Sequence, residues 1–380
     1  MSFELTEEQH LIQVNIREFA REVLAVSAAE RDRTQEYPAE NLKEMGELGL
    51  MGMLVPTEYG GEGLDTISYA LAVTEVAYAC ASTAVIMSVH NSIVCGSLAR
   101  FGTEIQKQKY LRKLAAADII GSFAMTEPEA GSDPSALKCT ATRETDTYFL
   151  NGTKRFITGG ATSSLFIVLA RRPTSRGHEG ISAFLVTPDM PGFEVGHIED
   201  KIGLRASDTC DLVFSDCRIP SENLLGLEEE GFKIAMSGLD AGRIGIAAQS
   251  LGIGMAAMDA AVKYSKERSQ FDQPIASFQG LRWMIAEMAM DVECARLLVT
   301  SAAAMKDRGE KCSAQASMAK LHASEMANRV TAQAIQIHGG YGVTKDYTVE
   351  RLYRDARALT IYEGTSQIQK IVIANEFLRD

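Results

Sequence analysis

The nine prolines of this 380-residue chain are unevenly placed, and their distribution limits the fold more than any other feature. Two lie before residue 60, six fall between residues 128 and 220, and the last is Pro274. Proline cannot continue the interior of a helix, because it lacks the amide hydrogen and clashes with the preceding turn. Residues 275–380 therefore have room for long helices, whereas the middle of the chain does not.

Hydrophobic periodicity agrees with this division. The segment "TEEQHLIQVNIREFAREVLA" predicts a helix with Thr6 as its N-cap. Its apolar residues fall mostly on one face: Leu11, Ile12, Val14, Ile16, Phe19, Val23 and Leu24. The stretch "TISYALAVTEVAYACASTAVIMSVHNSIVCGSLARFG" is apolar almost all round, which is typical of helices buried in a bundle. From "GFKIAMSGLDAGRIGIAAQSLGIG" onward, the helical period returns and holds to the end.

The middle third has the period of strands. In "TYFLNGTKRFITGG", Asn151-Gly152 stands between two apolar-rich runs and predicts a hairpin turn. The short strands "SSLFIVLARRP", "GISAFLVTPD" and "CDLVFSDCRIP" follow between turn residues. We therefore expect an α+β chain, mainly α, with three domains. These are an N-terminal all-α domain (1–120), a middle β domain (121–225) and a C-terminal helical domain (226–380).

Composition excludes several classes of function. A net charge of −12 argues against nucleic acid or an anionic membrane as the main partner. The chain has no run of about 18 apolar residues, so we expect no membrane span. The start, "MSFELTEEQHLIQ", has neither a basic leader nor an apolar signal core, so we expect a cytoplasmic protein. The seven dispersed cysteines show no metal-ligand spacing and predict reduced thiols without a metal.

One carboxylate near the C-terminus needs an explanation. Glu363 interrupts the otherwise apolar segment "LTIYEGTSQIQKIVIA". It could lie in a surface loop between two helices, or it could be a catalytic base held out of water. Burial raises the pKa of a carboxylate toward the range in which it is an effective base. Gly364, directly after it, would let the backbone approach a substrate closely.

Other polar segments also permit two interpretations. "FAMTEPEAGSD" could be a connecting loop, and "KRFITGG" a strand that ends in a turn. "YSKERSQFDQPIASFQ" offers Arg268 and Gln279 as polar contacts, or forms a solvated helix–loop–helix. His338, in "QIHGGYGVT", is more typical of a structural histidine than of a ligand. Asp240 and Arg243, three residues apart on an apolar helix, could pair with each other.

Taken together and in this order, the segments resemble the acyl-CoA dehydrogenase family of FAD flavoproteins. The resemblance rests on "LTEEQ", "TEPEAGSD", "NGTKRFITGG", "DKIGLRASDTCDLVF", "LDAGRIGIAAQ", "QIHGGYG" and "RDARALTIYEGTSQIQ". Within the family, "STAVIMSVHNS" and "LDAGRIGIAAQSLGI" look closest to the short-chain, butyryl-CoA branch. The resemblance implies an N-terminal helical domain, a middle β domain and a C-terminal four-helix bundle.

The resemblance also implies a reaction, the α,β-dehydrogenation of a short-chain acyl-CoA to a trans-2-enoyl-CoA, as in fatty-acid β-oxidation. Glu363 matches the catalytic base, which takes the α-proton while flavin N5 takes the β-hydride. The Glu363 backbone N–H and a flavin ribityl hydroxyl would stabilise the enolate oxygen. Electrons would pass to electron-transfer flavoprotein. The site would be assembled between subunits of a homotetramer, a dimer of dimers.

Further residues match binding positions of the family. Segments that line the flavin ring are matched by Phe123, Met125, Thr126, Phe156, Ile157 and Thr158. Ser132 matches a position near both flavin and CoA. Places where one subunit holds the FAD of its neighbour are matched by Arg268, Phe271, Gln279, Gln336, Ile337, His338, Gly339 and Gly340. Contacts to the ADP portion of FAD are matched by Thr365, Ser366 and Gln367, and substrate contacts by Phe232, Asp240, Arg243, Tyr362 and Gly364.

Some positions depart from the family pattern. Asp272, in "RSQFD", stands where the family often has glycine. Aspartate tolerates positive φ better than most residues, but an acid near a pyrophosphate is unfavourable. Arg282 and Trp283 are also unlike the short-chain pattern, and we interpret them as a helix-face arginine and a core tryptophan. Ala84 occupies the position of an arginine in the glutaryl branch, which disfavours a dicarboxylic acyl group.

Three alternatives stay open. The substrate could be a branched, cyclic or aryl-substituted acyl-CoA. The protein could be an acyl-CoA oxidase that reacts with oxygen, although such oxidases are usually much longer chains. It could instead be a non-catalytic acyl-CoA-binding or assembly member of the fold, against which the presence of Glu363 argues.

Overall fold

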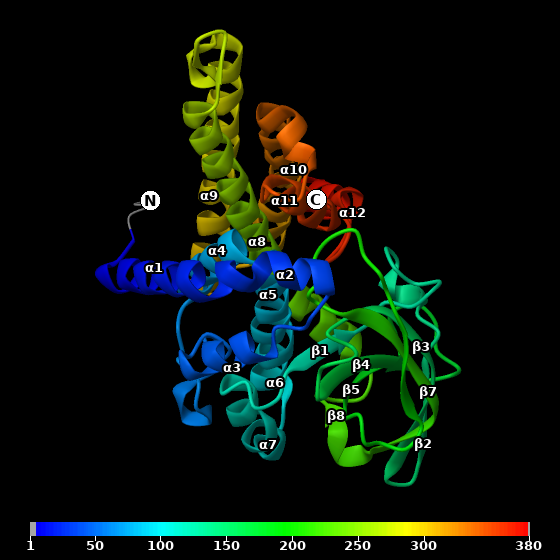
Figure 1. Cartoon of the computed structure of the whole chain (residues 1–380). Coiled ribbons are helices and arrows are strands. Elements are labelled where there is room, and N and C mark those ends of the chain that lie inside the picture. Colours follow the sequence, from blue (N-terminus) through cyan, green and yellow to red (C-terminus); the bar gives the residue numbers. More distant parts are fainter. Residues whose placement is uncertain (1–4, 379–380) are drawn as a thin grey trace.

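A computed structural model describes residues 5–378, and in it helices come first, then a sheet, then helices again (Figure 1). The N-terminal helices are α1 (Glu7–Phe19), α2 (Ala25–Thr34), α3 (Ala39–Glu47), α4 (Thr66–Ala79), α5 (Ala81–Ser88), α6 (Gly96–Phe101) and α7 (Glu104–Ala115). Two π-helical turns, Ala20–Leu24 and Val89–Cys95, join α1 to α2 and α5 to α6. The predicted N-cap is confirmed, because Thr6 Oγ1 accepts the Gln9 amide in a capping box.

The middle of the chain forms one eight-stranded sheet. Its strands are β1 (Gly121–Ala124), β2 (Thr140–Glu144), β3 (Thr147–Thr158), β4 (Leu165–Arg171), β5 (Ile181–Val186), β6 (Phe193–Ile198), β7 (Thr209–Pro220) and β8 (Leu224–Leu225). They pair in the order β6-β7-β3-β2-β4-β5-β8, and β1 pairs in parallel with β4. Alternate residues of β4 face two different cores, so the sheet is packed on both sides at this strand.

The predicted hairpin turn at Asn151-Gly152 is wrong. Both residues lie inside β3, and the turn that joins β2 to β3 falls at residues 145–146. The pairing of β3 with β7 has a register shift between Leu150 and Gly152, where Gly152 has a φ of 142°. The dipeptide therefore marks a β-bulge, since glycine supplies the same backbone freedom to a bulge as to a turn.

The C-terminal part is built on three long helices. Its elements are α8 (Gly231–Glu267), a hairpin of β9 (Ser269–Gln270) and β10 (Gln273–Pro274), α9 (Gln279–Asp307), α10 (Ser313–His338), α11 (Val349–Ala358) and α12 (Ser366–Phe377). Helix α8 packs against α4, α9 and α10, and α10 also packs against α11 and α12. Figure 1 shows this bundle above the sheet and the remaining N-terminal helices.

Small residues let α8 approach its neighbours closely. A Cβ on Gly252 would lie 2.2 Å from the Thr74 carbonyl oxygen of α4.

Segments Ala81–Phe101 and Gly231–Glu267 are long and apolar enough to cross a membrane by length and composition. Their most apolar windows are 94% and 78% buried within the fold, as in the core helices of a soluble protein.

Two expectations about side chains need correction. Leu11 and Val14 were predicted to share the apolar face of the first helix, but they are 55% and 40% exposed. Trp283 was predicted in the core, yet it lies 61% exposed on α9, because the core-facing positions of that helix are Met288, Val292 and Ala295. Arg282, beside it, is exposed as predicted.

The domain boundaries stay a proposal. We propose the divisions 1–120, 121–225 and 226–380, because the first helices end before Gly121 and α8 begins after the last strand of the sheet. Residues 1–4 and 379–380 lie outside the part of the chain that the structure describes.

Candidate active site

Glu363 lies in the loop between α11 and α12, and its backbone is left-handed. Its φ is 56°, and that of Gly364 is 89°. A side-chain-bearing residue adopts this region rarely, because Cβ crowds the following carbonyl. Such strain persists only where the surroundings hold it, and it gathers at functional sites.

The carboxylate of Glu363 is enclosed by α8 and the π-helical turn Val89–Cys95. Its Oε2 atom is buried and has no hydrogen-bond partner among the described residues. A Cβ on Gly242 would lie 2.7 Å from this oxygen and 3.1 Å from Ile93 Cδ1. The glycine therefore leaves the space that the carboxylate occupies. An unpartnered buried oxygen of this kind is unusual in a structural role, because desolvation without a hydrogen bond is costly.

Burial and the surrounding charges together place the pKa of Glu363 near 7. Burial raises the pKa of Glu363 to about 7, and the positive charges of Arg243 and Lys320 partly oppose this rise. Burial also lowers the pKa of Lys320 to about 8, while the negative charge of Glu363 acts in the other direction. A carboxylate with a pKa near 7 is ionised often enough to accept a proton and strong enough as a base to take it.

Two further polar groups hold the segment before Glu363. Tyr362 donates its hydroxyl to Gln249 Oε1 at 2.5 Å, and Gln249 Nε2 donates to the Ala81 carbonyl at 2.9 Å. Burial raises the pKa of Tyr362 well above its usual value, and the charge of Glu363 adds to this. Tyr362 is therefore a neutral hydrogen-bond donor that anchors the loop to α8 and, through Gln249, to α5.

The backbone after Glu363 is held from α10 and α12. Gln369 Nε2 donates to the carbonyl oxygens of Glu363 and Gly364, both at 3.0 Å. Lys320 Nζ donates to the Gly364 carbonyl at 2.7 Å. Among the described residues, no hydrogen bond uses the backbone N–H of Glu363. That N–H is therefore available to a ligand oxygen.

Sequence analysis missed Lys320, Gln249 and Gln369. The signal for Lys320 is a single lysine in "ASMAKLHA", where Ala316, Ala319 and Ala323 are buried on the same face. Gln249, in "GIAAQSLGI", stands out in the same way. A polar residue on a buried helical stripe must find a hydrogen-bond partner, which makes it a candidate for a role in a site.

The predicted flavin-lining segments of the sheet lie side by side. The Arg155 amide donates to the Thr126 carbonyl at 2.8 Å, and Ser122 Oγ donates to the Thr158 carbonyl at 2.6 Å. These contacts bring residues 123–126 next to residues 156–158. Phe156 has a φ of 58° and is 56% exposed, so a large ring stands open to solvent or to a ligand. Ile157 is 2% exposed in the core, and only its backbone can reach a ligand.

The predicted substrate residues on α8 are partly brought together with Glu363. Arg243 is buried and acts on the charge of Glu363, as described above. Arg243 also pairs with Asp240 at 2.8 Å, which confirms the pairing considered from their spacing. Asp240 accepts a second hydrogen bond from Ser313 Oγ at 2.5 Å. Phe232 lies at the start of α8 beside His178, and Ser132 is exposed in the loop after β1.

Arg268 and the 337–340 segment line a hollow of about 440 Å³ away from Glu363. Arg268 is exposed, stands over the Tyr341 ring and forms no ion pair within the described residues. His338 is a structural histidine as expected, since its Nδ1 bonds the Ala334 carbonyl and its ring stacks on Tyr264. Gln279 and Gln336 are exposed but do not line this hollow, and Phe271 is 87% exposed.

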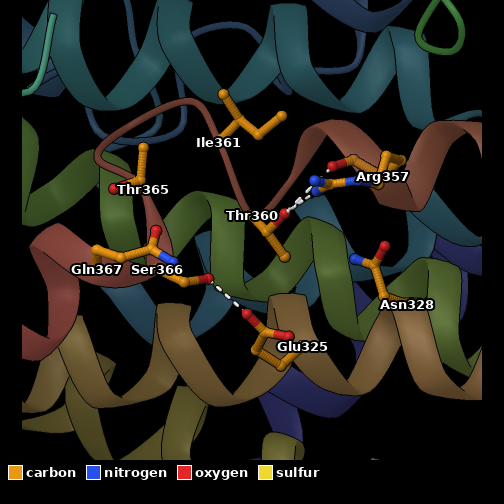
Figure 2. A pocket seen from close by; sticks show the side chains of 8 residues that line it. All are labelled: Glu325, Asn328, Arg357, Thr360, Ile361, Thr365, Ser366 and Gln367. Atoms are coloured by element: carbon orange, nitrogen blue, oxygen red, sulfur yellow. Dashed lines mark hydrogen bonds between the residues drawn. The ribbon is translucent and has the colours of Figure 1, made fainter.

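Another hollow, of about 290 Å³, lies at the start of α12 (Figure 2). Thr365 is the N-cap of α12, and its Oγ1 accepts the Ile368 amide. Ser366 donates to Glu325 Oε1, and Gln367 lies beside it at the rim. The hollow is lined by Glu325, Asn328, Arg357, Thr360, Ile361, Thr365, Ser366 and Gln367. The N-terminal end of a twelve-residue helix attracts anions such as phosphate.

These observations define a class of protein. Helices enclose a buried carboxyl group with a pKa of about 7, and no hydrogen bond among the described residues uses the backbone N–H of the same residue; an enzyme that removes a proton next to a carbonyl needs both groups. The chain belongs to the acyl-CoA dehydrogenase family. The N-terminal domain of that family matches residues 6–118, its middle domain residues 122–217 and its C-terminal domain residues 229–378.

Named relatives match the whole chain. A short-chain-specific acyl-CoA dehydrogenase of Clostridium acetobutylicum is 48% identical, with all of both chains covered. An acryloyl-CoA reductase (NADH) of Anaerotignum propionicum is 46% identical, over all of this chain and 96% of the relative.

Solved structures give the same result. The butyryl-CoA dehydrogenase of Megasphaera elsdenii has a TM-score of 0.97 and 44% identity, with both chains fully covered. A chain from a study of the electron transferring flavoprotein of Acidaminococcus fermentans has a TM-score of 0.98 and 49% identity, again with full coverage. A prolyl acyl carrier protein oxidase, AnaB, has a TM-score of 0.95 and 32% identity and covers 99% of this chain and 100% of its own. The expected length difference therefore does not separate oxidases from this chain.

FAD is the cofactor of this family. A glutaryl-CoA dehydrogenase of Mycobacterium smegmatis is solved in complex with FADH2. It is 31% identical to this chain with a TM-score of 0.94, and the match covers 98% of this chain and 95% of the other. The residues present fit the group. The start of α12 offers a site for phosphate, the exposed Phe156 ring offers an apolar surface, and Arg268 offers a cation without an ion-pair partner in the described chain.

Proposed function

We propose that the chain removes hydrogen from the α and β carbons of a short-chain acyl-CoA, with Glu363 as the catalytic base. The observation that carries this proposal is that Glu363 has a buried Oε2 atom and a backbone N–H, neither of which has a hydrogen-bond partner among the described residues. One residue thus offers both an acceptor for the α-proton and a donor to the thioester oxygen. These are the two groups that proton removal next to a carbonyl requires.

The residues of the chain divide the work as follows. Glu363 Oε2 accepts the α-proton, and the electron pair of the broken C–H bond becomes part of the new double bond. The Glu363 N–H stabilises the negative charge that develops on the thioester oxygen. FAD, when bound, supplies the acceptor for the hydride that leaves the β-carbon. We propose that Phe123, Met125, Thr126, Phe156, Ile157 and Thr158 line the flavin and that Thr365, Ser366 and Gln367 hold its ADP portion.

Close packing near the base supports a short acyl group. Gly245 of α8 faces Ser88 Oγ and the Tyr69 hydroxyl, which would lie 2.2 and 2.5 Å from a Cβ at that position. Both side chains are buried, and Tyr69 bonds Ser88. Tyr362 donates to Gln249 in the same region, and both Tyr69 and Tyr362 lie close enough to Glu363 to feel its charge. These packed side chains near the base favour a short acyl group, in agreement with the short-chain and butyryl-CoA names of the relatives.

The similarity to an acryloyl-CoA reductase supports a second direction of the same reaction. In the reverse reaction, Glu363 would donate a proton to the α-carbon of an enoyl-CoA. A pKa of about 7 leaves both the protonated and the ionised carboxyl populated at neutral pH. The site therefore permits both directions, and the redox partner would decide between them.

We propose electron-transfer flavoprotein as that partner, on the strength of the similarity to the chain from the Acidaminococcus study. We further propose a homotetramer in which Arg268, Phe271, Gln279 and residues 336–340 of one subunit meet the FAD of another. Its support is that Arg268 and Phe271 are exposed in the single chain, although Arg268 stands over the Tyr341 ring and Phe271 lies beside Phe278, and Arg268 forms no ion pair within the described residues. A cytoplasmic location is proposed with it.

A panel of acyl-CoA thioesters tests the proposal. We expect purified protein to be yellow, to bleach anaerobically with butyryl-CoA and to bleach far more slowly with branched, cyclic, aryl-substituted and dicarboxylic thioesters. In Glu363→Gln, the amide is nearly isosteric but is not a competent base. The bleaching rate should fall by at least about 10²- to 10⁴-fold, with flavin content unchanged. Bleaching of the variant near the wild-type rate would remove Glu363 from the mechanism.

The same preparation separates the remaining alternatives. A non-catalytic acyl-CoA-binding protein would bind butyryl-CoA without bleaching. An oxidase would regain its colour rapidly in air after bleaching, whereas a dehydrogenase would regain it rapidly only with electron-transfer flavoprotein.

A further inference from the structure

Three hydrogen bonds from buried side chains converge on the backbone carbonyls of Glu363 and Gly364, and the reaction as described uses none of them. Gln369 of α12 donates to the Glu363 and Gly364 carbonyls, and Lys320 of α10 donates to the Gly364 carbonyl. Both side chains are completely buried. Such a cluster is costly to bury and needs an explanation.

We infer that Lys320 and Gln369 are positioning residues that hold the left-handed Glu363–Gly364 turn, and that the charge of Lys320 also tunes the base. This inference rests on the proposed function of Glu363 and names residues that act through it.

The geometry supports a clamp. Successive φ values of 56° and 89° place the Glu363 and Gly364 peptide groups in an orientation that a side-chain-bearing residue does not favour. With both carbonyls held at 2.7–3.0 Å, neither peptide group can rotate without breaking a buried hydrogen bond. Tyr362, tied to Gln249, holds the chain on the other side of Glu363. These contacts therefore hold the backbone on both sides of Glu363, which orients its N–H and the start of its side chain.

The charge of Lys320 acts on Glu363 among several other charged groups. Several charged and titratable groups face Glu363 from the elements packed against it: Arg243 with Asp240 on α8, Lys320 and Glu325 on α10, Tyr69 on α4, and Tyr362 in its own loop. Arg243 is already paired with Asp240, and Glu325 is bonded to Ser366. Lys320 forms no ion pair within the described residues. Its charge is therefore the least compensated one near the base.

Replacement of Lys320 and of Gln369 should affect the pKa of Glu363 and the reaction rate differently. Gln369→Leu removes two hydrogen bonds but no charge. Lys320→Met removes one hydrogen bond and a positive charge that favours the ionised form of Glu363. Loss of the charge should raise the pKa of Glu363, whereas loss of the Gln369 contacts should leave that pKa in place and lower the rate.

The experiment measures exchange of the α-hydrogen of butyryl-CoA with deuterium oxide, by the flavin-loaded enzyme under anaerobic conditions, across a pH range. For Gln369→Leu, we expect a loss of about tenfold or more in exchange with an unchanged apparent pKa, because small misplacements of a catalytic group are expensive. For Lys320→Met, we expect a lower maximal rate and an apparent pKa above that of the wild type. Lys370→Met, an exposed lysine next to Gln369, is the matched control and should match the wild type.

Each outcome decides the inference. An unchanged apparent pKa in Lys320→Met, or a Gln369→Leu rate within twofold of the wild type, would overturn the corresponding part. If Lys320→Met does not accumulate as folded protein, Lys320→Gln keeps a donor for the Gly364 carbonyl and must still raise the pKa. Failure of the wild type to exchange, or retention of exchange by Glu363→Gln, would instead overturn the proposed function. Flavin content and melting temperature of each variant separate these effects from loss of fold.

Discussion

Gly242 of α8 and Glu363 of the α11–α12 loop share one small space. A Cβ on Gly242 would lie 2.7 Å from Glu363 Oε2, well inside the contact distance of the two atoms. The position of the base therefore depends on a residue 121 positions earlier in the chain that contributes only its missing side chain.

Gly242→Ala should displace the carboxylate while leaving the helix intact. Alanine favours a helix over glycine by about 1 kcal/mol, so stability should be preserved or raised. The flexible end of Glu363 can move away, which should reduce the bleaching rate with butyryl-CoA by about tenfold or more. Gly96→Ala is the control, since the nearest atom to its Cβ is 3.7 Å away. Equal rates for both variants would show that the carboxylate position is not critical.

Glu363→Gln should stabilise the protein in a defined pH range. Burial raises the pKa of Glu363 to about 7, above its value of 4.5 in the unfolded chain. The folded state then binds more protons than the unfolded state between these pH values, so wild-type stability falls as pH rises from about 4.5 to 7. The glutamine variant lacks this loss. Its gain over the wild type should grow across this range, to at most about 3 kcal/mol above pH 7.

Denaturant unfolding of the two proteins at pH 5 and pH 8 provides the measurement. A difference in unfolding free energy that is the same at both pH values would contradict a raised pKa for Glu363.

Arg268→Ala should weaken flavin retention. The side chain forms no ion pair within the described residues and contacts only the Tyr341 ring among the aromatic groups. Its removal should cost the isolated chain little, so a large effect must come from FAD or a second subunit. We expect lower flavin content and a smaller apparent mass after gel filtration. Lys266→Ala, an exposed lysine two residues earlier, is the control. A fully flavinated assembly of unchanged mass would show that Arg268 is a solvent-exposed side chain that binds neither FAD nor a second subunit.

Asp272→Gly should improve flavin retention with little effect on stability. Phe271 and Asp272 form the two-residue turn between β9 and β10, with φ values of 52° and 62°. Glycine removes the strain at this position but loses more entropy on folding, and the two effects oppose each other within about 1 kcal/mol. Removal of the carboxylate should favour a nearby pyrophosphate. Flavin content during dialysis is the measurement, and faster loss from the variant would refute the expectation.

Arg282→Gln should leave the substrate preference unchanged. Arg282 is exposed on the first turn of α9 beside the exposed Trp283. We expect the relative kcat/KM values across the thioester panel to stay within about twofold of the wild type. If Arg282 held a polar acyl end, loss of a charge-assisted hydrogen bond would cost roughly 1.5–3 kcal/mol for that substrate. This is about a tenfold or greater selective loss.

Local signals in the sequence determined the order of the fold. Proline placement and hydrophobic period predicted helices, then a sheet, then helices, and Thr6 is the N-cap that was predicted for the first helix. Glu363 stood out as one acid in an apolar segment. Turn and cap preferences, apolar stripes and isolated charges act between residues close together in the chain, so they can be recognised without coordinates.

Only the tertiary structure decided how these parts meet. Asn151-Gly152 has the composition of a turn, but pairing of β3 with β7 makes it a bulge. Trp283 is exposed because packing of α9 turns other residues toward the core. Lys320 reaches Gly364 across 44 residues, and Gln249 reaches Tyr362 across 113. The partners of these residues depend on how α8, α10 and α12 pack, which is the sum of many weak interactions over the whole core and cannot be recognised from neighbouring residues in the sequence.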